Sequence, residues 1–276
     1  MQFRVLIDCS DKKGLVYQVS KIFYENGLNI EKNSEFVDSE YKKFFMRSVV
    51  SGSISKNELI DRLKTVLPQD ANIEVIEQKR KKIVIMATKE SHCLGDLLIR
   101  HVDGELNADI EAVISNRSTL KQLTQKFDIP FHCIEAEGMS RDMHEQKVVE
   151  LLQNYSFDYI VLAKYMRILN PSLVKLFEDK IINIHHSFLP AFIGANPYKQ
   201  AHKRGVKIIG ATAHFVNNML DEGPIIYQDI IRIDHSYSWQ EMKQAGQDVE
   251  KIVLAKALKY ALEDRIFVYA NKTVIF

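Results

Sequence analysis

From residue 82 to residue 184, short apolar segments alternate with longer segments of helical periodicity. Residues 82–87 are almost continuously apolar, which is typical of a strand that is covered on both faces. Parallel strands need long crossover connections, and helices usually supply them. The alternation therefore predicts an α/β domain with a Rossmann-like, doubly wound and mostly parallel sheet, whose ligands bind beyond the carboxyl ends of the strands.

Within this domain, strands are expected at residues 82–87, 110–114, 131–134, 159–163 and 181–184, and helices at 93–102, 118–127, 143–155 and 171–177. The pattern becomes strand-rich between residues 207 and 233, and residues 238–262 are expected to form one long amphipathic helix. The tail, residues 267–276, contains Asn271-Lys272, which predicts a hairpin turn between two short strands.

Residues 1–80 follow a different order of elements. Strands are expected at residues 2–9, 28–37, 44–51 and 72–77, with one helix that ends at Asn26-Gly27 and a second at 55–67. This β-α-β-β-α-β order is that of the ferredoxin-like fold. We therefore expect two domains, a ferredoxin-like α+β domain at 1–80 and an α/β domain at 81–276.

The composition favours a globular protein and narrows its partners. The chain has 276 residues, 46% of them apolar, and a formal net charge of +1, which argues against a nucleic-acid or membrane partner. No apolar run approaches the ~20 residues of a membrane helix, and the first residues are expected to form a strand rather than a signal peptide. Three widely separated cysteines, with neither metal-ligand nor redox spacing, predict reduced thiols in a cytoplasmic protein.

Four polar side chains lie among apolar segments between residues 182 and 223: Asn183, His185, His214 and Asp221. Burying such groups is unfavourable unless they satisfy one another or a substrate. Asn183 and His185 share strand parity and are expected to point the same way, whereas His186 is expected to point away as a structural residue. A hydrogen-bond donor beside an imidazole that a carboxylate orients can stabilise an oxyanion and move a proton. The pattern predicts a catalytic site that needs no metal, since adjacent histidines cannot share one strand face.

Five segments carry a resemblance to a known family: residues 163–169 (Ala-Lys-Tyr-Met-Arg-Ile-Leu), Asn183-Ile-His185, Ser187-Phe-Leu-Pro190, His214-Phe-Val216 and Asp221-Glu-Gly223. In order and spacing, over about residues 81–233, they resemble the formyltransferase family that uses 10-formyltetrahydrofolate. The N-terminal segment resembles an ACT domain, in which a Gly-Leu turn opens the first helix. An ACT domain before a formyltransferase-like domain is the arrangement of the formyltetrahydrofolate deformylases, which the run at residues 185–194 also resembles.

The resemblance implies hydrolysis of 10-formyltetrahydrofolate to formate and tetrahydrofolate, with Asn183, His185 and Asp221 as the catalytic residues. Asn183 and a protonated His185 would stabilise the oxyanion. Asp221 would orient the water, accept its proton or hold His185 in its cationic form. His214 is expected to support the site by holding Asp221 or its loop. The reaction would supply formate for purine synthesis and balance the one-carbon folate pools, without a cofactor.

The family also implies two segments that hold the pterin of the folate substrate. They are Met166, Arg167, Ile168 and Leu169, and Asn217, Asn218, Met219 and Leu220. Core packing of Met166 and Leu169 and a structural salt bridge of Arg167 are the alternatives. In the ACT half, the candidate positions for an amino-acid effector are Asp11, Gly14 and Asn29, although this half is equally expected to serve only assembly. ACT domains commonly pair, so the resemblance implies a homo-oligomer.

Two other functions stay open: formyl transfer to an amine such as glycinamide ribonucleotide, and amino-acid sensing through the ACT half. In the transferase, a Gly-Ser-Asn loop after the first strand binds the phosphate of the acceptor. The matching loop, residues 88–93, lacks that glycine and carries Glu90, which would repel a phosphate. Water is therefore the expected nucleophile, and the intact catalytic set argues against a purely sensory role.

Overall fold

The computed structural model describes residues 1–190 and 197–276, which form two compact units. Unit 1 comprises Met1–Lys79, Asp264–Phe267 and Val274–Phe276, and unit 2 comprises Arg80–Glu263 and Val268–Thr273. The tail was expected to lie wholly in the second domain, but two parts of it cluster with the first unit. Of the run at 185–194 that resembles the deformylases, residues 191–194 lie outside the described residues.

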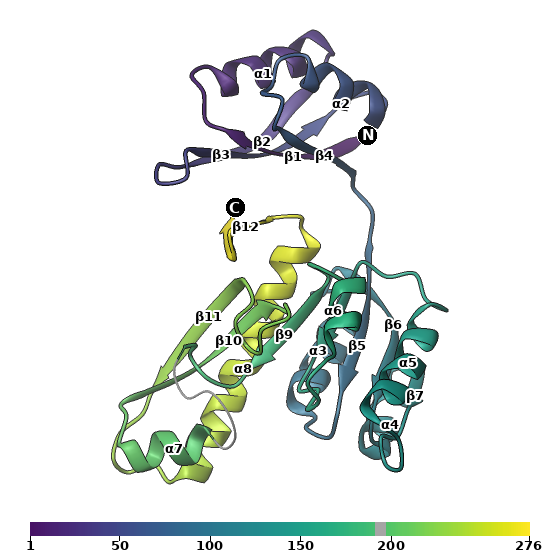
Figure 1. The fold of residues 1–276 in the computed structure, drawn as a ribbon, viewed down its shortest axis with the longest axis vertical. Coiled ribbons are helices and arrows are strands. Elements are labelled where there is room, and N and C mark those ends of the chain that lie inside the picture. The colour runs from purple at the N-terminus through teal and green to yellow at the C-terminus, as the bar shows by residue number, and fades with distance from the viewer. Residues whose placement is uncertain (191–196) are drawn as a thin grey trace. The chain divides into compact units, whose positions relative to one another are not determined.

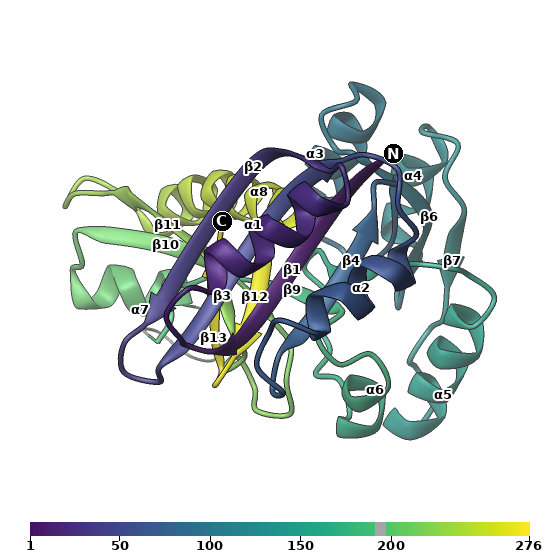
Figure 2. The ribbon, with the colours of Figure 1, turned by 90° about the horizontal axis from the view of Figure 1, so that it is seen from above.

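Unit 1 contains β1 (Gln2–Ser10), α1 (Leu15–Glu25), β2 (Asn29–Asp38), β3 (Lys43–Ser51), α2 (Lys56–Lys64) and β4 (Asn72–Glu77). The strands form an antiparallel sheet in the order β2-β3-β1-β4, and both helices lie on one face of it (Figure 1, Figure 2). Alternate residues of β1, such as Phe3 and Val5, share one core with Leu15 and Phe23 of α1. The element order predicted for residues 1–80 is present.

A buried ion pair holds the tail segment within unit 1. Nη1 of Arg4 lies 2.7 Å from Oδ2 of Asp264, and Nε of Arg47 donates to the backbone oxygen of Asp264 at 2.7 Å. Phe267 packs edge-to-face on Phe45, with ring centroids 5.5 Å apart. These contacts join residues more than 200 positions apart, so sequence periodicity does not reveal them.

Unit 2 contains a seven-stranded sheet in the order β11-β10-β9-β8-β5-β6-β7. Its elements are β5 (Lys81–Ala87), α3 (His92–Val102), β6 (Ala108–Ser115), the 3₁₀ turn η1 (Ser118–Leu120), α4 (Lys121–Gln125), β7 (Phe131–Cys133), α5 (Arg141–Leu152), β8 (Tyr159–Leu162), α6 (Pro171–Leu176), β9 (Ile181–His185), α7 (Pro197–Arg204), β10 (Ile208–Phe215), β11 (Ile225–Arg232) and α8 (Trp239–Leu262). Strands β9, β8, β5, β6 and β7 are parallel, whereas β10 is antiparallel to its two neighbours. The predicted mostly parallel sheet is confirmed.

The central strand β5 is covered on both faces, as its apolar sequence predicted. Val84 and Met86 share a core with residues of α5 and α6. The intervening Ile83 and Ile85 point to the opposite face and are also fully buried. A strand in this position needs apolar side chains at every residue, which explains the near-continuous apolar run.

Helix α7 was not expected from the sequence. It is short and polar, and it packs on α8 through Tyr198, which is buried beside Met242. Gly246 of α8 makes this packing possible, because a Cβ at that position would collide with the ring of Tyr198. Tertiary packing, through Tyr198 and the buried Ala201, thus stabilises a short helix whose sequence is otherwise polar.

The predicted hairpin of the tail is present, but its turn lies one residue earlier than Asn271-Lys272, because Lys272 already belongs to the second strand. Strands β12 (Ile266–Tyr269) and β13 (Lys272–Ile275) flank Ala270 and Asn271, both of which have positive φ, as a type I′ turn requires. Across the described ranges of the chain, no helix combines the length and the apolarity needed to span a bilayer.

Candidate active site

A cavity of about 540 Å³ lies at the carboxyl ends of β8 and β9, beside the loop that follows β10. Its lining includes the four polar residues of the sequence pattern, Asn183, His185, His214 and Asp221. It also includes both expected folate segments, Met166, Arg167, Ile168 and Leu169, and Asn217, Asn218, Met219 and Leu220. The fold therefore brings all twelve of these residues, from three separate parts of the chain, to one cavity.

Asn183 and His214 contact each other because they are direct partners in the antiparallel ladder of β9 and β10. Nδ1 of His214 lies 2.8 Å from the backbone oxygen of Phe215, and its Nε2 lies 3.2 Å from Nδ2 of Asn183. Burial lowers the pKa of His214, so the ring is neutral at pH 7. Both contacts are satisfied when Nδ1–H donates to Phe215 and Nε2 accepts from Asn183. This tautomer fixes the orientation of the Asn183 amide, which retains a second N–H donor.

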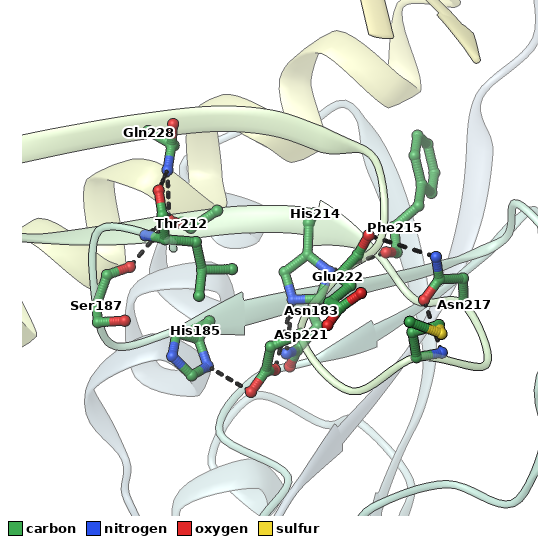
Figure 3. A network of polar contacts seen from close by, with 12 residues as sticks. Asn183, His185, Ser187, Thr212, His214, Phe215, Asn217, Asp221, Glu222 and Gln228 are labelled. Atoms are coloured by element: carbon green, nitrogen blue, oxygen red, sulfur yellow. Dashed lines mark hydrogen bonds and ion pairs between the residues drawn. The ribbon is translucent and has the colours of Figure 1, made fainter. Parts of the chain in front are cut away.

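His185 and Asp221 form the second pair of the site, with Nδ1 of His185 3.2 Å from Oδ2 of Asp221 (Figure 3). Burial alone would raise the pKa of Asp221, but the hydrogen bond and the charge of His185 outweigh it, and the pKa lies below its ordinary value. Asp221 is therefore anionic at neutral pH. Among the described residues, Nε2 of His185 is one of the few buried side-chain atoms without a hydrogen-bond partner.

The loop that carries Asp221 is held by two side chains and one glycine. Nδ2 of Asn271 donates to the backbone oxygen of Glu222 at 2.9 Å, and Oδ1 of Asn271 accepts from Asn217 at 3.3 Å. A Cβ at Gly223 would overlap the backbone oxygen of Phe215, so the turn after Asp221 requires glycine. The sequence marked Asn271 only as a turn residue, and no local signal indicated its contact with this loop.

Thr212 fixes the chain just after His185. It is fully buried, and its hydroxyl donates to the backbone oxygen of Ser187 at 2.9 Å (Figure 3). The Thr212 hydroxyl oxygen in turn accepts from the backbone N–H of Leu189 at 3.1 Å and from Nε2 of Gln228 at 2.8 Å. Sequence reasoning missed this residue, although a hydroxyl within an apolar strand always needs a partner.

His186 does not point away from His185, so that expectation was wrong. The two rings stack with centroids 4.9 Å apart, and both line the cavity. Strand β9 ends at His185, and the side-chain alternation that the prediction assumed does not extend beyond it. Burial lowers the pKa of His186 to about 4, helped by the positive charge of Lys164, so this ring is neutral at pH 7.

A second polar cluster lies next to the cavity and was not expected from the sequence. Glu250 of α8, whose side chain is 1% exposed, contacts the ammonium of Lys164 at 3.2 Å, Nε2 of His92 at 2.7 Å and the hydroxyl of Tyr198 at 2.7 Å. These partners lower the pKa of Glu250 to about 2, against the opposing effect of burial. Lys164 has a φ of 63°, a left-handed conformation that costs a lysine roughly 1–2 kcal/mol.

Glu90 belongs to the same cluster, which changes the argument made for it from the sequence. Its carboxylate lies 3.1 Å from Nζ of Lys243 and 3.8 Å from Nζ of Lys164. Although burial opposes ionisation, the two lysines lower the pKa of Glu90. The two lysines thus largely neutralise the charge of Glu90. Its carboxylate would repel a phosphate less strongly than the sequence indicated.

His92, Cys93 and Glu250 are the side chains, among those described, whose potential ligand atoms lie within 4.8 Å of one another. Burial raises the pKa of Cys93 well above its ordinary value, so its thiol stays protonated, whereas metal binding needs the thiolate. The ammonium of Lys164 already contacts Glu250. This group is therefore suited to anchoring Lys164 rather than to holding a metal ion.

The positions considered for an amino-acid effector lie in unit 1. Asp11 and Gly14 lie between β1 and α1, where Gly14 has a φ of 92° and precedes the helix. Asn29 is the first residue of β2. All three residues are exposed, but Asp11 and Gly14 follow the end of β1 that pairs with Lys43, whereas Asn29 pairs with Ser51 at the opposite end of the sheet.

The fold and the site define a class of protein. The sequence model of the formyl transferase family matches residues 81–258, which span nearly all of unit 2. Glycinamide ribonucleotide transformylase 1 from Symbiobacterium toebii is 27% identical, with a TM-score of 0.68 over 71% of this chain and 94% of that chain. Unit 2 therefore has the formyl transferase fold.

Relatives that match over the whole length narrow the class. The formyltetrahydrofolate deformylases of Haemophilus influenzae and Escherichia coli K12 are 54% and 52% identical, over 98% and 97% of this chain and 98% and 95% of theirs. The crystal structure of a formyltetrahydrofolate deformylase from Pseudomonas syringae is 41% identical, with a TM-score of 0.94 over 100% of this chain and 95% of that chain. The chain therefore belongs to the formyltetrahydrofolate deformylases of the formyl transferase family.

Proposed function

We propose that this chain hydrolyses 10-formyltetrahydrofolate to formate and tetrahydrofolate. One observation carries the proposal: Asn183, His185 and Asp221 line a single cavity, and the free ring nitrogen of His185 is buried without a protein partner. A buried polar atom left unpaired is unfavourable unless a ligand supplies the missing partner. The arrangement fits a substrate whose reacting oxygen occupies that position.

The second N–H of Asn183 and a protonated Nε2 of His185 are the two donors available to the oxyanion. Water adds to the formyl carbon, and the tetrahedral oxyanion forms between these donors. Oδ2 of Asp221 holds Nδ1 of His185, which leaves Oδ1 of the carboxylate to orient the water and take its proton. When the intermediate collapses, the bond from the formyl carbon to N10 breaks, and N10 leaves with that proton. His214 acts as a positioning residue, because it sets the direction of the Asn183 amide.

The folate substrate is proposed to lie between the two segments that flank the cavity. Four apolar side chains of these segments are more than half exposed: Met166, Ile168, Met219 and Leu220. Exposed apolar groups that line one cavity are suited to covering the faces of an aromatic ring such as the pterin. Arg167 is the proposed partner for a carboxylate of the substrate.

The remaining parts of the proposal concern partners and context. We propose that the reaction needs neither a metal nor another cofactor, and that its partners are the folate substrate and water rather than nucleic acid or a membrane. The formate released would serve purine synthesis and the balance of one-carbon folates in the cytoplasm.

Unit 1 is proposed to be an ACT domain that assembles the protein into a homo-oligomer. Its antiparallel β2-β3-β1-β4 sheet with two helices on one face supports this proposal. Asp11 and Gly14 at one end of the sheet, and Asn29 at the other, are the positions at which we propose to test the binding of an amino-acid effector. Calorimetric titration with single amino acids and light scattering of the free protein test the two parts separately.

Formate release from 10-formyltetrahydrofolate, measured with and without glycinamide ribonucleotide, tests the catalytic proposal. We expect formate in both cases, and a loss of at least ~10²-fold in Asn183→Ala, since that variant removes one oxyanion donor. Turnover that depends strictly on the amine would instead show formyl transfer. Amino-acid binding without any turnover would show a sensor.

A further inference from the structure

Lys164 occupies a position whose backbone favours glycine. Its φ is 63°, and its backbone oxygen accepts from the N–H of Thr88 at 3.2 Å, so the end of β8 is joined to the loop after β5. The side chain is only 5% exposed, with the ammonium 3.2 Å from Glu250 and 3.8 Å from Glu90. Glycine would adopt this backbone conformation without strain. The presence of lysine therefore indicates that its side chain has a function at this position.

This side chain lines two cavities. The catalytic cavity has a volume of about 540 Å³, and a second cavity of about 330 Å³ is lined by Glu90, Tyr198, Lys199, Trp239, Lys243, Gln247 and Glu250. Lys164, Met166 and His186 line both cavities. The second cavity therefore adjoins the one that contains Asp221 at these three residues, which we call the partition.

The partition lies next to the reacting groups. The ring of His186 stacks on that of His185 at 4.9 Å, and the charge of Lys164 acts on His186. The partition is also firmly held at its centre, because Glu250 is bound at once by Lys164, His92 and Tyr198. A buried ion pair with this many partners keeps a long, flexible side chain in one place.

We propose that the partition determines the specificity of the reaction, by closing the catalytic cavity toward the second cavity and so reserving the formyl carbon for water. This inference rests on the proposed hydrolysis. The second cavity is large enough for a small amine, but the partition keeps its occupant away from His185 and Asp221. Lys164 is the central member, because it fills the space that glycine would leave open.

Opening the partition should let an amine compete with water. In that reaction the nitrogen of glycinamide bonds to the formyl carbon, the bond from that carbon to N10 breaks, and the proton lost by the amine ends on N10. The experiment supplies 10-formyltetrahydrofolate and an excess of glycinamide and measures formate and N-formylglycinamide by mass spectrometry. The share of formyl groups that reach the amine reports on specificity and does not depend on the overall rate.

The decisive variant is Lys164→Gly/Glu250→Gln, which removes the side chain without leaving Glu250 as an unpaired buried charge. We expect its amine share to exceed that of the wild type by at least ~10-fold, a typical difference for a small change of pocket shape. Lys164→Met/Glu250→Gln is the matched control, because methionine keeps the volume and removes the charge. It should retain the low amine share of the wild type.

An amine share as low as that of the wild type in the folded Lys164→Gly/Glu250→Gln variant would overturn the proposal, as would an equal rise in the methionine control. Met166→Ala supplies an independent test, because Met166 is exposed and carries no ion pair, so its truncation does not disturb the buried cluster. We expect a smaller rise in amine share for this variant, and an unchanged share overturns the proposal. Absence of formate release by the wild type would refute the proposed hydrolysis itself. An unchanged amine share in the variants would refute only the role of the partition.

Discussion

The polar network around Asp221 and the ion cluster around Glu250 lie on neighbouring cavities of unit 2 and differ in what they leave unpaired. In the first network, His185 uses one ring nitrogen on Asp221, and the other is buried without a partner. In the second cluster, the two carboxylate oxygens of Glu250 are both occupied, by His92 and Lys164 on one and by Tyr198 on the other. The second cluster therefore satisfies itself, while the first needs a ligand.

Whether a buried polar atom lacks a hydrogen-bond partner therefore distinguishes a ligand site from a structural cluster more clearly than the extent of burial does. Both groups contain a histidine that contacts a carboxylate whose pKa is lowered, although His92 of the second cluster is only partly buried. A network in which every polar atom has a partner stabilises one arrangement of the chain. A network with an unpaired buried atom gains a hydrogen bond only when a substrate binds. Substitutions in the two groups should consequently affect different properties of the protein.

The largest effect is expected for Asp221→Asn. Asparagine tolerates the left-handed conformation of this residue, whose φ is 57°, so the change removes the charge and leaves the backbone unstrained. We expect the rate of formate release to fall by ~10²–10³-fold, with the unfolding free energy nearly unchanged. The rate of His185→Ala should fall by a similar factor. The surface variant Asp248→Asn, in the same unit, should release formate at the wild-type rate. A folded Asp221→Asn enzyme of near wild-type rate would remove Asp221 from the mechanism.

Glu250→Ala should show the reverse pattern, with its main effect on stability. It leaves the buried ammonium of Lys164 short of its nearest partner and should lower the free energy of unfolding by about 3 kcal/mol in urea titrations. Glu250→Gln keeps the shape and most hydrogen bonds, so its effect should be smaller. If Glu250→Ala unfolds at the same urea concentration as the wild type, the cluster is not a structural anchor.

The pH dependence of stability distinguishes the two groups further. The pKa of His186 is about 4 in the folded protein, below the ~6.5 of an unfolded histidine. The contribution of neutral His186 to the free energy of unfolding is therefore complete above pH ~6.5. It is lost as the pH falls toward 4, by at most ~1.4 kcal/mol per pH unit, because the unfolded chain binds the proton more readily. His186→Gln should flatten the plot of unfolding free energy against pH between pH ~4 and ~6.5. Glu250, with a pKa of about 2, should change the stability only below pH ~4.3, where unfolded glutamates begin to bind protons. Identical slopes for the wild type and His186→Gln would contradict the assignment.

The smallest effect is expected for Asn271→Gly. Glycine retains the positive φ of this turn and removes the hydrogen bonds to Glu222 and Asn217, each of which contributes ~1 kcal/mol. We expect kcat to fall by up to ~10-fold with little change in KM, because the Asp221 loop becomes less well positioned, and Tm to fall by a few degrees because two hydrogen bonds are lost. A change in Tm without a change in kcat would assign Asn271 to the hairpin alone.

Much of the fold follows from local patterns. The apolar run of β5 and the end of α1 at Asn26-Gly27 each depend on a few neighbouring residues, and both predictions are confirmed. The tail hairpin is also present, with its turn one residue earlier than predicted. Helix α7 was missed because its stability comes from Tyr198 packing over Gly246, far along the chain. The position of His186 was predicted wrongly because strand parity holds only while the strand continues, and β9 ends one residue earlier.

The sequence by itself determined which residues are proposed to carry the chemistry: Asn183 and His185 share a strand, and their spacing with Asp221 is readable without coordinates. Only the tertiary structure decided how these groups are partnered. It placed His214 opposite Asn183, bound Asp221 to His185 and left one nitrogen free, and it assembled Lys164 and Glu250 from positions 86 residues apart. The physical reason is that side-chain identity and backbone periodicity are local properties, whereas hydrogen-bond satisfaction depends on which distant groups the packed chain brings within about 3 Å.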